Sequence, residues 1–345
     1  MLINKLKKQV EVLQLNLRGK VVLTEAATGA YIVTPILAAL AGAKVYAYTK
    51  SSFYGSVYDV VQQTKRVYEG LNENELNITF IEELKPELIF EADIITNSGH
   101  LRPLNKEKLQ HAKDDLVIAL MYEAWERRDA DMDINYIKKR GFKVGATNER
   151  HPDIDVFNFL GEMAIKQIFD AGLCLFKNKF ILVCNNDFGT YIAKVLSKMC
   201  DGLCVIDHDE NKDKYDFPNI DWVGGFPKID IPLSYKDAEA VIFTAYPFVN
   251  TWIGKNGEPI KIKSIQNALT NPLILRFAGH IDMAAFKEAG VPYFPNHVAA
   301  GHMGVLPSAI GYDPIIRLQA GGLKVAEAML TDNYNFKNMS IGELI

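Results

Sequence analysis

Residues 179–207 read KFILVCNNDFGTYIAKVLSKMCDGLCVID, and this stretch indicates the class of fold. An apolar run over 179–184 is followed by a turn, a helical pattern over 189–199 and a second apolar run that ends at Asp207. Strand–helix–strand units of this kind build parallel sheets with helices packed on their faces. The stretch therefore predicts an α/β protein.

The same alternation continues on both sides of this stretch. Further apolar runs lie at 20–26, 44–50, 77–82, 92–99, 116–124, 143–148, 240–245 and 272–277. The two series predict two doubly wound Rossmann-like lobes with an interdomain cleft. We expect a flavodoxin-like substrate domain at 1–154 plus 305–345 and a Rossmann cofactor-binding domain at 155–304, connected by an amphipathic helix over 155–170.

The composition narrows the class of partner and the compartment. The 345 residues include 38 Lys and Arg against 42 Asp and Glu, so the formal charge is −4, without the basic excess that favours nucleic acid. The four cysteines form no CxxC pair, the histidines lack zinc-binding spacing, and no run approaches the roughly 20 apolar residues that span a bilayer. We expect a cytoplasmic protein with a small-molecule substrate and no metal, nucleic acid or membrane partner.

Polar residues gather where the predicted strands of the first lobe end. In a parallel sheet the loops at the carboxyl ends of the strands form the binding edge. The residues that we expect to contact the substrate there are Glu25, Thr28, Asn97, Ser98, Trp125 and Asn148. Glu123 and Glu126 flank Trp125, which would place an aromatic wall beside a carboxylate, and burial there would raise the pKa of that carboxyl group. Surface pairing of the local acids with Arg127 and Arg128 is an equally simple interpretation.

The turn between Cys184 and Gly189 lies where a dinucleotide-binding fingerprint would fall. Only Gly189 keeps a glycine of the G-x-G-x-x-G pattern, the one that allows close packing of the helix on the strand. Asn186 crowds the place of a pyrophosphate, and Asp187 adds negative charge at a helix N-terminus. The residues that we expect at the cofactor site are Asn185, Asn186, Asp187, Gly189, Asp207, Thr244 and Tyr246.

Asp207 ends the second strand of this lobe, where an acidic residue accepts the ribose hydroxyls of an adenosine. An acid at this place favours NAD over NADP, but it would serve S-adenosylmethionine equally well. The missing glycines suit S-adenosylmethionine, since that ligand has no pyrophosphate. They also suit a lobe that binds no ligand.

Four stretches carry a resemblance to a known family. They are 17–21 (LRGKV), 142–148 (FKVGATN), 279–282 (GHID) and 299–302 (AAGH), the last followed by Ser308. In these stretches, and from about Leu17 to Met329, the chain resembles the adenosylhomocysteinase-like two-domain Rossmann proteins, and more distantly the D-2-hydroxyacid dehydrogenases. GHID is similar to that family's N-x-G-H-F-D element, and AAGH to its A-M-G-H-P element.

The resemblance implies NAD in the second lobe, His280 and His302 near the nicotinamide, and a homodimer. It does not imply adenosylhomocysteine hydrolysis, because the positions of the family's catalytic Lys and Asp hold Ile154 and Asn158. An isoleucine cannot take a proton, and a neutral amide cannot orient a lysine. His297 looks like the catalytic histidine of the dehydrogenases, whose arginine is displaced here.

The candidates for proton transfer are His280, His302, Glu123 and His151. Each histidine follows a predicted strand, where an imidazole can exchange a proton near neutral pH. Histidines bonded to nearby backbone, or a turn at Pro152, are the simpler alternatives. The sequence predicts an NAD-binding enzyme that performs redox chemistry on a small polar substrate in the cleft. An S-adenosylmethionine-dependent methyltransferase and a non-catalytic ligand-binding homologue are the alternatives.

Overall fold

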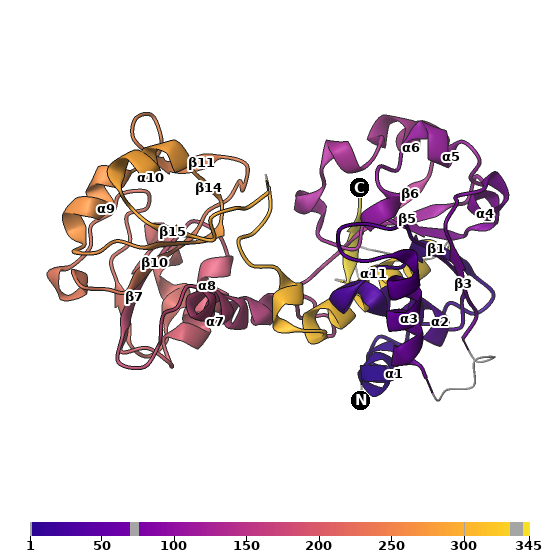
Figure 1. Cartoon of the computed structure of the whole chain (residues 1–345), viewed down its shortest axis with the longest axis horizontal. Helices are drawn as coiled ribbons and strands as arrows, with labels where there is room; N and C mark the ends of the chain where they lie inside the picture. Colours follow the sequence, from indigo (N-terminus) through magenta and orange to yellow (C-terminus); the bar gives the residue numbers. More distant parts are fainter. Residues whose placement is uncertain (1, 70–75, 300, 332–340) are drawn as a thin grey trace. The chain divides into compact units, whose positions relative to one another are not determined.

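The computed structural model describes residues 2–69, 76–299, 301–331 and 341–345. The chain divides into two compact units: Met1–Val156 with Gly311–Ile345 (unit 1), and Phe157–Ile310 (unit 2). Each unit is a mainly parallel sheet covered by helices (Figure 1). The predicted α/β class is therefore confirmed. No helix in the described ranges is both long enough and apolar enough to cross a bilayer.

The sheet of unit 1 has seven strands, in the order β16-β6-β5-β4-β1-β2-β3. Their bounds are β1 Val21–Glu25, β2 Lys44–Tyr48, β3 Ile78–Ile81, β4 Ile94–Thr96, β5 Val117–Ala119, β6 Lys143–Thr147 and β16 Gly342–Leu344. Neighbouring strands pair in parallel except β16, which is antiparallel to β6.

The order of the first six strands, 3-2-1-4-5-6, is that of a dinucleotide-binding Rossmann sheet. The flavodoxin-like character expected for this unit is therefore wrong, since that fold has the order 2-1-3-4-5. The pattern of apolar runs shows how many strands exist, but not on which edge a strand is added. The chain adds β3 outside β2 and then returns to place β4 beside β1.

Helices cover both faces of this sheet. Their bounds are α1 Leu2–Val12, α2 Val33–Leu40, α3 Val57–Val67, α4 Pro86–Glu91, α5 Lys106–Leu109, α6 Ile134–Arg140 and α11 Asp313–Met329. Helices α1, α2 and α11 share one hydrophobic core, while α4, α5 and α6 share the other. A buried hydrogen bond of 2.9 Å from Thr34 Oγ1 to Gln319 Oε1 joins α2 to α11. The C-terminal helix thus completes the core of unit 1.

Unit 2 repeats the same plan. Its main sheet has the order β15-β13-β10-β7-β8-β9, which is again 3-2-1-4-5-6 counted from β7, and all its pairs are parallel. The strands are β7 Lys179–Cys184, β8 Gly202–Ile206, β9 Ile220–Trp222, β10 Ala240–Thr244, β13 Ile274–Ala278 and β15 Tyr293–Phe294. A small sheet holds β11 Thr251–Gly254, β12 Ile260–Lys261 and β14 His280–Ile281.

The helices of unit 2 lie in two layers. Their bounds are α7 Leu160–Asp170, α8 Phe188–Leu196, α9 Ile262–Ala268 and α10 Met283–Ala289. Helices α7 and α8 share one core with alternate residues of the main sheet, and α9 and α10 share the core on the other face. In each unit the strand order reverses at a switch point, where the carboxyl ends of two neighbouring strands meet. These strands are β1 and β4 in unit 1, and β7 and β10 in unit 2.

Candidate functional sites

Glu25 lies at the switch point of unit 1. It ends β1, and its carboxylate accepts a hydrogen bond of 3.0 Å from the backbone N–H of His100, just after β4. Gly99 makes this contact possible, because a Cβ at Gly99 would lie only 1.7 Å from the Glu25 Oε1 atom. A negative charge therefore stands at the place where a Rossmann sheet usually meets its ligand.

Glu123 is a buried carboxylate held by three donors. It is 5% exposed and accepts hydrogen bonds from the Glu149 N–H at 3.2 Å, from Arg150 Nη1 at 2.8 and 3.0 Å, and from Trp125 Nε1. The structure thus brings Glu123 and Trp125 together. Both carboxylate oxygens of Glu123 therefore have hydrogen-bond donors.

The proton-carrying acids lie beside it. Glu126 ends the short 3-10 helix Ala124–Glu126, Glu149 follows β6, and their carboxyl groups are hydrogen-bonded to each other. Burial, reinforced by the nearby carboxylates, raises the pKa of Glu126 to about 7 and the pKa of Glu149 well above its usual range. The pair therefore shares a proton near neutral pH. The sequence pointed to Glu126 as one of two carboxylates beside Trp125, whereas Glu149 was not among the expected site residues.

Tyr31 belongs to the same cluster. It lies in the 3-10 helix Gly29–Ile32 that follows β1. Burial first, and then the charges of Glu149 and Glu126, raise the pKa of the Tyr31 phenol to about 12. The phenol consequently stays protonated and remains a donor at neutral pH. The sequence around Tyr31 does not predict this environment, because Glu126 and Glu149 follow β5 and β6, far from Tyr31 in the chain.

The shared proton predicts a pH dependence of stability. A carboxyl whose folded pKa lies above its unfolded value binds more protons when folded, so stability falls as pH rises from about 4.5 to 7. We expect Glu126→Gln to flatten the fall in urea midpoint across this window. The exposed Glu82→Gln serves as the control and keeps the wild-type slope. A wild-type slope in Glu126→Gln would contradict the shared proton.

Two of the residues expected to contact the substrate, Asn97 and Ser98, form hydrogen bonds within unit 1. Asn97 is fully buried: its Nδ2 donates to the Tyr122 hydroxyl at 2.6 Å, and its Oδ1 accepts from Arg102 Nε at 3.2 Å. Both ends of the Asn97 amide are therefore bonded to side chains of unit 1. Ser98 Oγ bonds to Thr96 Oγ1 at 2.8 Å, but Ser98 remains half-buried at the edge.

The loop after β6 is held by its own side chains. Asn148 Oδ1 accepts from the Arg150 N–H at 3.0 Å, and His151 Nδ1 accepts from the Asp153 N–H at 3.2 Å. His151 thus takes part in a local turn around Pro152, the arrangement named above as the alternative to a role in proton transfer. Thr28 precedes the helix of Tyr31 and makes no capping bond with its side chain.

Asparagine side chains tie together the loops at the switch point of unit 2. Asn185 accepts from the Tyr246 N–H at 2.8 Å and donates to the Tyr246 carbonyl at 3.0 Å. Asn186 donates to Thr244 Oγ1 at 3.2 Å and accepts from the Phe188 N–H at 3.1 Å, at the start of α8. Four of the expected cofactor residues thus lie together. Asn186 is not among the residues with positive φ, so it does not replace the turn glycine.

Gly189 fills the packing role expected of it. A Cβ there would lie 2.4 Å from both Cys184 Sγ and the Tyr215 hydroxyl, so helix α8 reaches this distance from β7 only without a side chain. Asp187 is exposed, with its carboxylate 3.9 Å from Lys214 Nζ. The N-cap position of α8 is therefore occupied by an exposed acidic residue.

Asp207, which we expected at the adenosine ribose, is surrounded by hydrogen-bond donors of its own unit. Asp207 is 1% exposed, and its Oδ2 accepts from the Tyr215 hydroxyl at 2.7 Å. Its Oδ1 accepts from the His208 N–H at 2.6 Å and from Asn211 Nδ2 at 3.2 Å. The 3-10 helix Asp209–Tyr215, which follows His208, supplies the Asn211 amide and the Tyr215 hydroxyl. The spacing in the sequence shows that Asp207 follows the strand, but it does not show that Asn211 and Tyr215 donate hydrogen bonds to it.

Two of the expected catalytic histidines lie in unit 2. His280 begins β14, and its Nδ1 lies 3.4 Å from Arg276 Nη2. Burial, and then the Arg276 charge, lower the pKa of the His280 imidazole. His302 donates its backbone N–H to the Ala299 carbonyl at 3.0 Å. Ala300, in the AAGH motif, lies outside the described residues.

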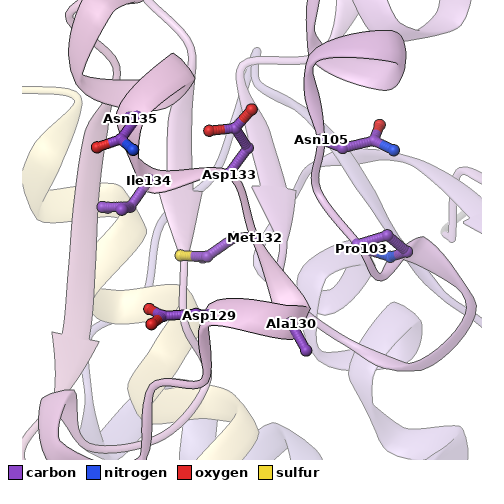
Figure 2. A pocket seen from close by; sticks show the side chains of 8 residues that line it. All are labelled: Pro103, Asn105, Asp129, Ala130, Met132, Asp133, Ile134 and Asn135. Carbon is purple, nitrogen blue, oxygen red and sulfur yellow. The ribbon is translucent and has the colours of Figure 1, made fainter.

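A surface hollow of about 450 Å³ lies beside α5 and α6 of unit 1 (Figure 2). It is lined by Pro103, Asn105, Asp129, Ala130, Met132, Asp133, Ile134 and Asn135. Its two acids already have partners, since Asp129 pairs with Arg127 at 3.0 Å and Asp133 caps α6. The hollow contains none of the expected site residues. In the described part of the chain, no cluster of three or more His, Cys, Asp or Glu could hold a metal ion.

Two sheets of order 3-2-1-4-5-6 with polar carboxyl edges make this chain a two-unit Rossmann-type α/β protein. No family model matches it, and no curated protein does.

Solved structures match the chain over most of its length. A dipicolinate synthase chain from Bacillus subtilis is 12% identical, with a TM-score of 0.57 over 92% of this chain and 98% of that one. The corresponding dipicolinate synthase chain from Bacillus halodurans is 13% identical, with a TM-score of 0.53 over 86% and 96%. A transhydrogenase from Sinorhizobium meliloti is 11% identical, with a TM-score of 0.51 over 90% and 95%. At these identities the likeness concerns the fold.

Proposed function

We propose that the chain is an NAD-binding oxidoreductase that acts on a small polar substrate. Unit 2 is the cofactor domain in this proposal, and unit 1 is the substrate domain. The observation that carries it is the contact at Gly189, where α8 approaches β7 too closely for any side chain. In dinucleotide-binding sheets this close packing places the helix N-terminus at the switch point, against the pyrophosphate. The Rossmann order of unit 2 supports the same interpretation.

At the phosphate end of the site, the α8 N-terminus would face the pyrophosphate, with Asn185, Thr244 and Tyr246 alongside, and the packing at Gly189 holds that helix in place. The Asp187 carboxylate at the same helix end opposes an anion there. NAD, when bound, supplies the hydride acceptor. The ribose end does not fit the usual contact, because Asp207 already bonds to Tyr215 and Asn211. The adenosine ribose would therefore need another partner in this unit.

Unit 1 contributes the acid–base groups. The Glu126–Glu149 pair holds a proton near pH 7 and would exchange it with a hydroxyl or carbonyl oxygen of the substrate. Glu25, Ser98 and the 36% exposed Trp125 would contact the rest of a polar substrate. His280 and His302 would carry protons in unit 2.

From the resemblance to the adenosylhomocysteinase-like proteins, we propose only the division into a cofactor domain and a substrate domain. Ile154, at the family's lysine position, is a fully buried core residue of unit 1. Asn158, at the aspartate position, accepts a hydrogen bond of 3.1 Å from Lys194 Nζ. We therefore do not propose adenosylhomocysteine hydrolysis. The homodimer remains part of the proposal, and sedimentation equilibrium tests it.

Ligand-dependent unfolding tests the function. We expect NAD or NADH, at about 100 times its dissociation constant, to stabilise the protein by about 2.7 kcal/mol, seen as a rise in Tm. NADP, S-adenosylmethionine and S-adenosylhomocysteine at equal concentration are the controls and leave Tm unchanged. A shift with the sulfur ligands alone would overturn the redox proposal in favour of methyl transfer. Silence with all five ligands would mean that unit 2 binds no nucleotide.

A further inference from the structure

Arg276 is a buried cation that forms no ion pair with any residue in the described part of the chain. Its side chain is 2% exposed within β13, and it is the only arginine between residues 157 and 310. Its Nε and Nη1 atoms, which carry three of its five N–H groups, have no hydrogen-bond acceptor. None of the ion pairs among the described residues includes Arg276. The guanidinium thus lacks both charge compensation and most of its acceptors.

The groups around Arg276 cannot satisfy it. His280 Nδ1 lies 3.4 Å from Nη2, which is a long contact for a hydrogen bond, and the Tyr293 ring centroid lies 5.9 Å from the guanidinium carbon. Gln167 bonds only to the backbone carbonyl of Arg276, at 2.9 Å. A buried, unpaired charge is strongly destabilising, so proteins retain one where a ligand supplies the missing partner.

We infer that Arg276, together with His280, forms an oxyanion site in unit 2 for the carboxylate or phosphate group of a small ligand. A planar guanidinium binds either group through parallel N–H···O bonds, which a lysine cannot reproduce. His280 is half-buried at the start of β14, and its Nδ1 atom lies 3.4 Å from Arg276 Nη2. In the proposed site the imidazole would be the second group beside the anion. This site does not depend on whether unit 2 binds NAD.

Titration of the full-length protein with sodium oxalate and with inorganic phosphate tests the site, each against sodium chloride of equal ionic strength. We expect at least one of the two oxyanions to bind the wild type. In Arg276→Met the dissociation constant of that oxyanion should rise about tenfold or more. The exposed Lys198→Met serves as the control for nonspecific charge and binds like the wild type. Response to oxalate alone assigns a carboxylate ligand, and response to phosphate alone assigns a phosphate ligand.

Two further measurements separate an oxyanion site from a purely structural arginine. Without added oxyanion, Arg276→Met should unfold at the wild-type urea concentration or higher, because the variant loses an unpaired charge; a structural arginine would make it less stable. Crystals of the wild type soaked in selenate should show an anomalous peak beside Arg276, which needs no variant to fold. The inference is wrong if neither oxyanion binds better than chloride, if Arg276→Met binds as tightly as the wild type, or if selenate lies only at exposed lysines.

Discussion

Arg150→Met lowers the free energy of unfolding by about 2 kcal/mol, because it removes the cation that bonds to the buried Glu123 carboxylate. The full cost of breaking a buried pair is about 3–5 kcal/mol, but the Arg150 side chain is 38% exposed, and water reduces the loss. The backbone N–H of Glu149 and the Trp125 indole still donate to Glu123. Urea unfolding at pH 7 measures the change.

A surface ion pair of the same region provides the matched control. Arg127 bonds to Asp129, which is 89% exposed, so Arg127→Met should cost well under about 1 kcal/mol. The double variant Glu123→Gln with Arg150→Met should recover part of the loss, since the buried charge is then absent. Equal costs for Arg150→Met and Arg127→Met would contradict the importance of the buried pair.

Gly189→Ala lowers the free energy of unfolding by about 3 kcal/mol, at the upper end of the cost of overpacking a core. The new methyl would lie 2.4 Å from Cys184 Sγ and from the Tyr215 hydroxyl, and neither atom belongs to a flexible, exposed side chain. Either α8 moves away from β7, or the Cys184–Tyr215–Asp207 bonds break. Thermal or urea unfolding measures the loss.

Removing the two obstructing atoms tests the cause. In a Cys184→Ala, Tyr215→Phe background the sulfur and the hydroxyl are gone, so adding Gly189→Ala should cost less than half of its effect in the wild type. Such non-additivity is expected of residues in direct contact. A cost of Gly189→Ala within about 0.5 kcal/mol of zero in the wild type would contradict the close packing on which the NAD proposal rests.

The local sequence pattern was sufficient to predict strands such as β1 and β7 and the close packing at Gly189. The runs at 20–26 and 179–184 correctly indicated β1 and β7, because strand formation depends on short apolar, β-branched segments. Gly189 was also predictable, since a glycine at that offset after a strand has a recognised packing role. Asp207 shows the limit: its position at the end of β8 was right, but its partners come from a turn whose return path has no local signal.

The sequence alone determined the α/β class and the strand ends at which polar residues gather, because both depend on residues close together in the chain. The strand order of unit 1, the shared proton of Glu126 and Glu149, and the unpaired Arg276 could be known only from the assembled fold. These features depend on which distant segments become neighbours and on how much water they exclude. A carboxyl pKa or a missing counter-ion is a property of that assembled environment.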